Sequence, residues 1–441
     1  MRLRVAPPDS RLAWLDALRG LAVLFVVYEH LGDTLLRGIR QTTDQWFPAG
    51  RVGVYLFFLV SGYIIPASLE RKGSLRAFWV SRGFRLYPLY MVALASTLVL
   101  HFAGLMPMDK AVGAHVPTTV LAHVTMLPAL VDAPMVLQVT WTLAFEMCFY
   151  LLVTALFALR WHRASSTVAL GFAGAALLFV PLPVTLLSGS PSGPDSIAVL
   201  VVAALGVCIA AALRGRTVAM VGAVGLALVV VVLLGFNQQL AHSWDGLVIP
   251  AVMFTGTALY RAQQGQIPWW RALFAAAVVA TAEVVTQHRL DLPHQHATGQ
   301  TAVGTVVVVG VLFALGMWWG ARWRVPWTLS LLGVISFSIY MVHDLVILAL
   351  SRQLRSVADH NLAVRLTATV VVVALVVALS TLTYRAVERP AQALGSRINR
   401  WLDARAASAR PPVPPAQPRH SPVSGPPAVG VAPPGMVGDP V

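Results

Sequence analysis

Arg19 and His30 are the side chains of this sequence whose types and spacing point most directly to chemistry. Both lie in the run 15–36, which is apolar enough to cross a bilayer, a task that takes about 20 residues. Eleven residues separate them, or about three helical turns, so both face one side of the predicted helix. A cation near a membrane surface and a titratable imidazole deeper on the same side indicate a polar path into the protein. The alternative is a buried Arg and His that only hydrogen-bond to neighbouring helices.

Two more apolar runs contain groups suited to proton transfer. Glu146 lies five residues after Trp141, and His343 and Asp344 lie side by side in the run 327–350. Imidazoles and carboxylates act as general acids and bases, and inside a membrane they normally face the bundle interior. A hydrogen bond across helices is the alternative for His343, and a place in the interfacial aromatic belt is the alternative for Trp141.

A pair of arginines suits the binding of phosphate. Arg82 and Arg85 are three residues apart, which places them on one helical face at the predicted cytoplasmic boundary. The planar guanidinium group binds two phosphate oxygens at once. Such a pair also commonly anchors the topology of a membrane protein, so both interpretations stay open at this point.

The composition identifies the class of protein. The chain has 441 residues, of which 57% are hydrophobic and 11% are charged, whereas soluble domains carry about 25% charged residues. We therefore predict an integral membrane protein. The formal net charge of +14 comes mainly from basic residues between apolar runs, where they set topology and meet anionic lipid. The lipid bilayer is thus an expected partner, and nucleic acid is not.

No metal site is expected from the cysteines and histidines. Cys148 and Cys208 both fall within apolar runs, so they indicate neither a disulfide framework nor a thiolate site. His288, His294 and His296 lie close together, but without thiolates or a helical pair of ligands. We interpret them as loop histidines.

Transmembrane helices must position the candidate residues. We predict an all-α, polytopic transmembrane helical bundle of 10–12 spans in a domain that covers residues 1–395, followed by a Pro-, Ala- and Gly-rich disordered cytoplasmic tail at 396–441. The Arg- and Lys-containing loops between the apolar runs predict a multi-pass inner-membrane protein with both termini in the cytoplasm. Arg51, in a predicted outer loop, is one exception to the positive-inside rule. The apolar runs are 15–36, 51–70, 85–106, 141–160, 167–186, 196–213, 217–235, 246–261, 270–286, 301–321, 327–350 and 364–387.

Six motifs occur in order along residues 11–390: L-D-A-L-R-G with a His eleven residues after its Arg, F-F-L-V-S-G-Y, R-x-x-R-L-Y-P-L-Y, W-T-L-x-x-E-x-x-F-Y-L, S-F-S-I-Y-M-V-H and E-R-P. In this combination they resemble the acyltransferase 3 family of bacterial membrane acyltransferases. The resemblance implies a multi-helix enzyme that moves acyl groups from a cytoplasmic donor, usually an acyl-CoA, to hydroxyls of sugars, polysaccharides, glycolipids or macrolides. The matching positions are Arg19, His30, Arg82, Arg85, Trp141, Glu146 and His343.

The expected function is therefore that of a cell-envelope O-acyltransferase. It would move an acyl group, expected to be acetyl, from acyl-CoA as co-substrate to a hydroxyl of a carbohydrate or glycolipid acceptor. We expect catalysis by His30, Glu146 and His343, binding of the CoA phosphates by Arg19, Arg82 and Arg85, and substrate contact by Trp141 and Ser61. Ser61 has a packing alternative, because it lies beside Gly62 in a run of small residues.

In the expected mechanism His30 is the general base on the acceptor hydroxyl. Glu146 or Asp344 would orient its imidazole, and His343 or a helix terminus would stabilise the oxyanion. A rise of about 1.5 Å per residue predicts similar depths for His30, Glu146 and His343. A covalent acyl-histidine stays open as the alternative to direct transfer.

Two other classes of protein also stay open. In a proton-coupled secondary transporter the intramembrane Arg, His and Glu would form the substrate path. In a non-catalytic membrane protein they would only join helices. Stoichiometric release of free CoA distinguishes an acyltransferase from both. Among acyltransferases, a macrolide-like natural product is the alternative acceptor.

Overall fold

The computed structural model describes residues 13–179, 185–190, 192–212, 216–237, 245–289, 299–408 and 430. In these ranges the elements are helices, and the pairing of strands is limited to one isolated bridge between Thr185 and Asn237. The prediction of an all-α protein is confirmed. The chain divides into two units, Met1–Asn399 and Arg400–Val441, and the candidate site discussed below lies in the first unit.

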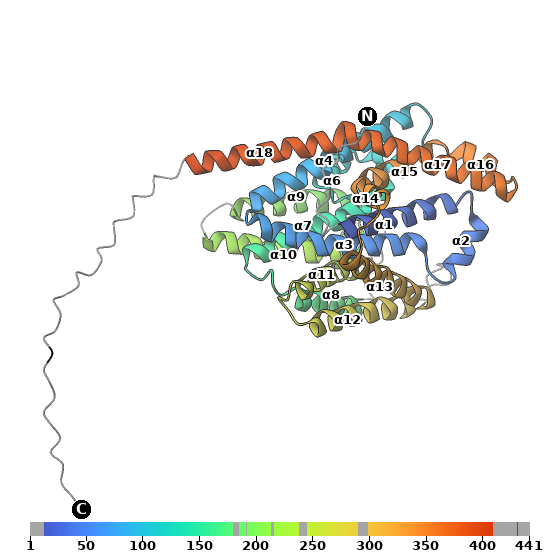
Figure 1. The fold of residues 1–441 in the computed structure, drawn as a ribbon. Coiled ribbons are helices and arrows are strands. Elements are labelled where there is room, and N and C mark those ends of the chain that lie inside the picture. The colour runs from blue at the N-terminus through green and yellow to red at the C-terminus, as the bar shows by residue number, and fades with distance from the viewer. Residues whose placement is uncertain are drawn as a thin grey trace, which may run out of the picture. The chain divides into compact units, whose positions relative to one another are not determined.

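Long helices make up most of the first unit (Figure 1). They are α1 (Ala13–Gly32), α3 (Ala49–Lys72), α4 (Leu75–Phe102), α7 (Trp141–Ala158), α9 (Gly193–Ala212), α10 (Arg216–Phe236), α11 (Asp245–Gln263), α12 (Trp269–Arg289), α13 (Gly299–Arg322) and α17 (Leu362–Thr383). The shorter helices are α2 (Arg37–Asp44), α5 (Lys110–Ala114), α6 (Val116–Thr125), α8 (Ser165–Phe179), α14 (Trp327–Val334), α15 (Ser336–Ala349) and α16 (Ser351–Ala358).

Eight described helices are long and apolar enough to cross a membrane, and α14 with α15, bent by 68°, would form a ninth span. This range is below the 10–12 spans expected, although each predicted apolar run overlaps a described helix. The difference has a physical reason. Helix α8 has only 15 residues, α1 contains Asp16, Arg19 and Glu29, and α11 contains Asp245 and Arg261, so none of the three resembles an ordinary lipid-facing span.

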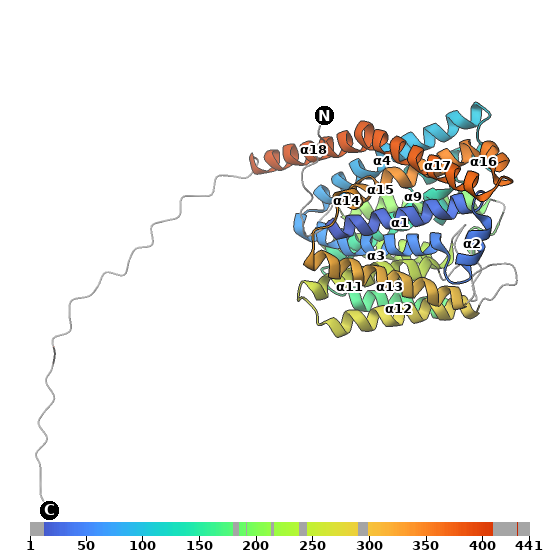
Figure 2. The same ribbon diagram turned by 45° about the vertical axis from the view of Figure 1, so that its right-hand side comes forward.

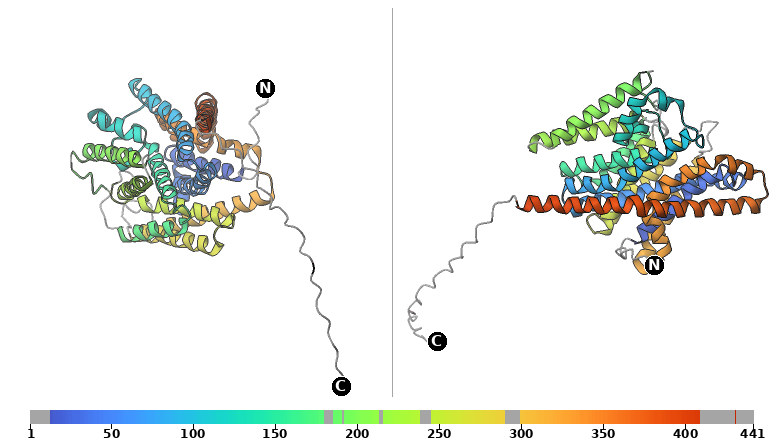
Figure 3. Two further views of the ribbon diagram at one scale, coloured as in Figure 1. Left: turned by 90° about the vertical axis from the view of Figure 1, so that its left-hand side faces the viewer. Right: turned by 90° about the horizontal axis from the view of Figure 1, so that it is seen from above.

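Helix α1 lies in the interior of the first unit, as the end-on view in the left panel of Figure 3 shows. It packs against α3, α13, α14 and α15, and α3 packs in turn against α11 (Figure 2). We call the end of the bundle at which α1 begins the proximal end, and the end at which it terminates the distal end. Helices α12 and α15 run in the direction of α1, whereas α3, α7, α11 and α13 run antiparallel to it.

Glycines allow the close approach of the helices that carry the candidate residues. A Cβ at Gly53 of α3 would lie 2.5 Å from the backbone oxygen of Ala22 in α1. A Cβ at Gly62 would lie 1.8 Å from the backbone oxygen of Met253 in α11. Close contact through small residues is a common means of holding helices together in a bilayer. These contacts fix the face of α1 that carries Arg19 and His30 against α3.

Two predicted boundaries differ from the described helices. Helix α4 begins at Leu75, ten residues before the apolar run 85–106, because Ser74 caps its N-terminus by accepting a hydrogen bond from the backbone N–H of Ala77. Helix α17 continues through a π-turn at Tyr384–Glu388 into α18 (Arg389–Ser408), past the expected domain end at 395. Apart from Gly430, the predicted tail beyond Ser408 lies outside the described residues.

Candidate functional site

His30 and His343 lie next to each other at the distal end of α1, with ring centroids 5.2 Å apart. His343 is fully buried, and its Nδ1 is 3.2 Å from the backbone oxygen of Ile339. Because a carbonyl oxygen only accepts hydrogen bonds, this contact places the proton of a neutral His343 on Nδ1. Its Nε2 then carries a lone pair, and that buried atom has no hydrogen-bond partner among the described residues.

A carboxylate completes this histidine pair. Asp344 is 5% exposed and interacts electrostatically with His30. Its Oδ2 is buried and makes no hydrogen bond within the described part of the chain. Of the two carboxylates expected to orient His30, Asp344 is therefore the one that the structure brings into electrostatic contact with it.

Glu146 lies in a different environment. Its carboxylate accepts a hydrogen bond of 2.5 Å from the hydroxyl of Tyr150, and it interacts electrostatically with Arg19. No hydrogen bond joins it to either histidine among the described residues. Glu146 therefore lies between the histidine pair and the arginines, rather than directly beside His30.

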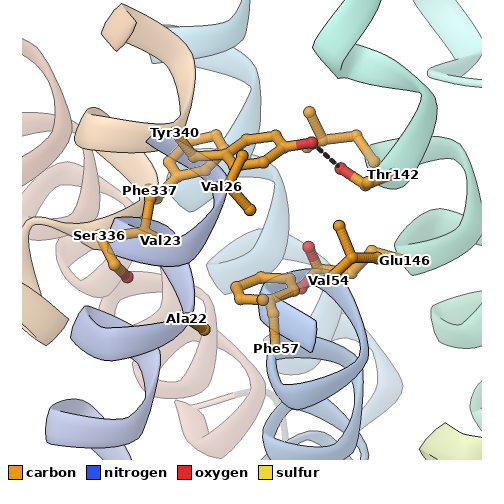
Figure 4. A pocket seen from close by; sticks show the side chains of 12 residues that line it. Ala22, Val23, Val26, Val54, Phe57, Thr142, Glu146, Ser336, Phe337 and Tyr340 are labelled. Atoms are coloured by element: carbon orange, nitrogen blue, oxygen red, sulfur yellow. Dashed lines mark hydrogen bonds between the residues drawn. The ribbon is translucent and has the colours of Figure 1, made fainter. Parts of the chain in front are cut away.

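A narrow cavity of about 30 Å³, lined by Glu146, lies along α1 between the positions of Arg19 and His30 (Figure 4). Glu146 and Thr142 of α7 and Tyr340 of α15 face Val23 and Val26 of α1 across it. The hydroxyl of Thr142 donates to the hydroxyl of Tyr340 at 2.8 Å, and Tyr340 donates to the backbone oxygen of Val139 at 2.8 Å. The other lining residues are Ala22, Gly53, Val54, Phe57, Leu143, Ser336 and Phe337. The cavity thus follows the face of α1 between Arg19 and His30, but its lining is mainly apolar, unlike the polar path expected from the spacing.

Arginines lie on the proximal side of this cavity. The guanidinium of Arg19 is 4.0 Å from the carboxylate of Asp16 and 5.8 Å from the ring centre of Phe57. It also interacts electrostatically with Arg85. The guanidinium of Arg82 is 5.3 Å from the ring centre of Tyr150, which in turn holds Glu146. The three predicted arginines are therefore near one another, and two of them are close enough to repel.

Arg82 also has capacity for a further acceptor. It is 9% exposed, and its Nε has no hydrogen-bond partner among the described residues.

Glu388 of the E-R-P motif interacts electrostatically with Arg85 and Arg19 and accepts a hydrogen bond of 2.9 Å from Ser338. The sequence analysis did not assign a role to Glu388, although a carboxylate late in an apolar helix was a visible signal.

A larger chamber of about 320 Å³ lies on the distal side of the histidine pair. It shares Val26, Val54 and Tyr340 with the narrow cavity, so the two spaces adjoin. Trp141 lines this chamber, and its contact with substrate stays a prediction. The remaining lining residues are Glu29, His30, Gly50, Arg51, Tyr55, Gln138, Val139, Asp245 and Ile249.

Ser61 lies elsewhere. It is 6% exposed on α3 beside Gly62, whose backbone oxygen accepts a hydrogen bond of 2.8 Å from Thr257 of α11. It lines neither the narrow cavity nor the distal chamber. The contact between α3 and α11 therefore favours the packing interpretation of Ser61, and its role in substrate binding stays a prediction.

Sequence reasoning missed an ionic network beside the distal chamber. Arg51 is not in a loop but in α3, where its guanidinium donates to Asp245 at 2.7 Å and to Glu283 at 2.8 Å. The hydroxyl of Tyr55 donates to Glu283 at 2.9 Å, and Gln287 donates to the same carboxylate at 2.8 Å. Glu283 inside an apolar run was the available signal, but its partner is 232 residues away.

Glu29 forms a second missed network immediately before His30. One carboxylate oxygen accepts a hydrogen bond of 2.6 Å from Arg40 of α2, and the other accepts one of 2.9 Å from the backbone N–H of Gly50 at the start of α3. Glu29 therefore ties the distal end of α1 to two other helices and fixes the position of its neighbour.

Metal binding finds no support in the described residues, which hold no group of three or more potential ligands. His288 belongs to α12, whereas His294 and His296 lie outside the described residues, so the predicted loop cluster is not tested as a whole.

With this geometry in view, comparison with known proteins identifies the family. The family model of the acyltransferase domain matches residues 12–199 and 196–385, which together cover most of the chain. The chain belongs to the acyltransferase 3 family. Every candidate residue lies within the matched regions, except Glu388 three residues beyond them. Membership supports an acyltransferase activity.

Curated relatives of this acyltransferase match over shorter stretches. A protein named as an O-acetyltransferase in Staphylococcus aureus strain COL is 35% identical over 96 residues, which cover 20% of this chain and 14% of the relative. The O-acetyltransferase OatA of S. aureus strain NCTC 8325 / PS 47 is 29% identical over 165 residues, covering 34% of this chain and 26% of OatA. The matches thus span about a quarter or less of these relatives. No solved structure matches this acyltransferase.

Proposed function

We propose that this membrane acyltransferase transfers an acyl group, in the first instance acetyl, from cytoplasmic acyl-CoA to a hydroxyl of a sugar, cell-surface polysaccharide or glycolipid. The observation that carries the proposal is that His30 lines a wide distal chamber with polar groups, and that this chamber adjoins a narrow, mainly apolar cavity along the face of α1 toward Arg19. An acceptor in the chamber and the acyl arm of a donor in the cavity would meet beside His30, which would act as the base.

The proximal route suits the donor. Arg19, Arg82 and Arg85 would bind the CoA phosphates, because guanidinium groups pair with phosphate oxygens bidentately. The repulsion between Arg19 and Arg85 is offset in part by Asp16, Glu146 and Glu388, and Nε of Arg82, which has no hydrogen-bond partner among the described residues, would donate to a phosphate oxygen. The thioester arm would extend along Val23 and Val26 of α1. Since the cavity holds only about 30 Å³, side chains such as Phe57 must move to admit the arm.

The distal chamber suits a hydroxyl-rich acceptor. Its volume of about 320 Å³ lies within the range of small-molecule sites, and its lining combines Trp141 with carboxylate, guanidinium, amide and hydroxyl groups. Aromatic faces and paired polar groups are suited to the apolar and hydroxyl surfaces of a sugar ring. This chamber would open to the side of the membrane opposite the donor, with both termini in the cytoplasm.

His30 would take the proton from the acceptor hydroxyl while that oxygen attacks the thioester carbonyl. The C–S bond then breaks, and the proton passes to the departing CoA thiolate. The lone pair on Nε2 of His343 makes this residue a hydrogen-bond acceptor that would orient His30, with Asp344 stabilising the imidazolium that forms. A neutral His343 in this tautomer has no proton to donate to an oxyanion, so we assign it to orientation instead of the oxyanion role first expected.

The test uses purified protein in nanodiscs with acetyl-CoA and a panel of sugars, oligosaccharides and a macrolide. The proposal predicts CoA release that depends on acceptor and equals the amount of acetylated product. A transporter would show acceptor movement without CoA release. Consumption of acetyl-CoA without acetylated product, or no consumption with any acceptor, would contradict the proposal. A burst of CoA release before product, in single-turnover experiments, would indicate an acyl-histidine in place of direct transfer.

A further inference from the structure

A mainly apolar groove of about 380 Å³, unused by the proposed mechanism, lies between α3, α11, α12 and α13. On α12 it extends from Trp269 to Glu283, fourteen helical steps that span about 21 Å at the helical rise. The groove is therefore long, and three of its four helices, α3, α12 and α13, are themselves candidate membrane spans. Its other lining residues include Leu259, Leu273, Val309, Gly310, Phe313 and Met317.

The groove is accessible from the bilayer side. Leu273 lines it and is 56% exposed, and the neighbouring Trp270 is 63% exposed. The guanidinium of Arg271 is 5.4 Å from the ring centre of Trp270. Tryptophan and arginine at a helix end mark the membrane interface. The proximal end of the groove thus lies at interfacial level, and its apolar length runs inward from there.

The distal end of the groove adjoins the chamber that contains His30. Tyr55 lines both spaces, and Glu283 lines the groove while it binds Arg51 of the chamber wall. A single layer of side chains therefore separates an aliphatic slot from a polar chamber beside the candidate base. An amphiphile with an apolar chain and a polar head would match this sequence of environments.

Charge at this junction restricts the head group. Arg51 is already bound by two carboxylates, those of Asp245 and Glu283. A phosphate placed between chain and sugar would lie against these acids without an available counter-charge. An uncharged linkage between the aliphatic chain and the sugar would not be repelled by these carboxylates.

We propose that the groove binds an aliphatic chain of the acceptor, and that the acceptor is a neutral glycolipid whose sugar hydroxyl reaches His30 in the distal chamber when the side chain of Tyr55, which lines both spaces, turns aside. This inference rests on the proposed function and selects one acceptor class within it. The chain leaves one apolar environment, the bilayer, for another, so burial adds little energy. Its effect is to position the head group, which raises the effective concentration of the hydroxyl at the base.

Gly310 offers a substitution that fills the groove. A Cβ at this position would meet no atom within 4 Å, so Gly310→Leu places a side chain in the groove without displacing the backbone. Gly206 of α9 provides the matched control. It is also a helical glycine at which an added Cβ would lie in open space, and it does not line the groove.

The experiment measures kcat/KM in nanodiscs with acetyl-CoA and paired methyl and dodecyl glycosides of the same sugars. We expect wild type and Gly206→Leu to prefer the dodecyl member by at least about tenfold. Gly310→Leu should lose most of this preference while its turnover of the methyl member stays unchanged. Because the three proteins share one bilayer, partitioning of the long chain into lipid affects them equally.

Three results would overturn the inference. They are equal chain-length preference in Gly310→Leu and wild type, no preference in wild type, and better turnover of a dodecyl-phosphate-linked sugar than of the neutral glycoside. A dodecyl glycoside with a photoreactive chain end tests binding without turnover, and it should label α12 or α13 in wild type and label Gly310→Leu less. Labelling without any acetyl transfer would support binding of the chain in the groove and contradict the proposed function. Acetyl transfer without labelling would support the proposed function and contradict binding of the chain in the groove.

Discussion

Two buried polar clusters lie at the distal end of the bundle, and their hydrogen bonds are satisfied to different degrees. In the Arg51 cluster the guanidinium binds Asp245, Glu283 and Tyr55, and Gln287 binds Glu283 from the next turn. In the histidine cluster, by contrast, His343 Nε2 and Asp344 Oδ2 are buried without a hydrogen-bond partner among the described residues.

The difference separates a structural role from a catalytic one. Leaving a buried polar group without a partner costs about 1–3 kcal/mol. The open groups beside His30 support the catalytic role that we propose for this cluster. They do not establish it alone, because other buried atoms such as the hydroxyl of Tyr90 and Nε of Arg261 also have no hydrogen-bond partner among the described residues. The difference between the two clusters therefore teaches that burial of charge does not by itself mark the active residues.

Breaking the Arg51 cluster should have the largest effect on stability. Arg51→Ala leaves Asp245 and Glu283 without their counter-charge, so we expect a loss of about 3–5 kcal/mol in folding free energy. Thermal unfolding in detergent measures it, with Arg37→Ala as the control because Arg37 is exposed and donates to the backbone oxygen of Asp33. An unchanged melting temperature would contradict the claim that the Arg51 cluster stabilises the fold.

Substitution in the histidine cluster should instead affect turnover. For His343→Ala we expect kcat to fall up to about 100-fold, because His30 loses its orientation. The melting temperature should fall by what a small cavity costs, because the fully buried imidazole is removed together with its bond to the backbone oxygen of Ile339. His343→Asn, which keeps a polar group near this position, should recover part of the rate. A parallel loss of folded protein in both variants would show that His343 only holds the helices together.

Substitution of Arg82 tests the donor side. Arg82→Lys keeps the charge but loses the planar fork, so we expect the KM for acetyl-CoA to rise about tenfold with kcat unchanged. Arg76→Lys, outside the cavity on the first turn of the same helix, serves as the control. An effect on kcat at saturating acetyl-CoA would move Arg82 from donor binding to the chemical step.

The smallest effect should come from the hydroxyl of Tyr340. Tyr340→Phe removes one hydrogen bond to Val139 and one from Thr142 but keeps the ring that lines both cavities. We expect about 1 kcal/mol of lost stability and less than about a tenfold change in turnover. A loss as large as that of His343→Ala would add Tyr340 to the groups that act on the substrate.

The helices and the shared helical face of Arg19 and His30 could be predicted from sequence, because both follow from patterns within one stretch of the chain. The apolar runs overlap the described helices, and the spacing of Arg19 and His30 gives the cavity that follows α1. The depth argument predicted similar depths for His30, Glu146 and His343, and His30 and His343 are indeed neighbours. Glu146 is bonded to Tyr150 on its own helix, and its role in orienting His30 stays a prediction.

The remaining features depend on contacts across the chain. From the sequence, Arg51 is predicted to be a loop arginine. Its partners Asp245 and Glu283 are 194 and 232 residues away along the chain and are identified only in the structure. The tautomer of His343 likewise depends on the orientation of its ring on α15, which no spacing reveals. Which residues pair over such distances depends on how the whole bundle packs. The periodic pattern of a single helix therefore does not predict these pairs.

The most direct test of the central claim is the rate of acceptor-dependent CoA release by His30→Ala, measured per folded molecule alongside its melting temperature. The account predicts a rate lower by about 10²–10⁴-fold, the usual contribution of a general base, with unfolding close to that of wild type. His30→Ala that keeps the wild-type rate would contradict it. So would a lost rate that is fully explained by lost folded protein, because His30 would then belong with Arg51 among the groups that hold the bundle.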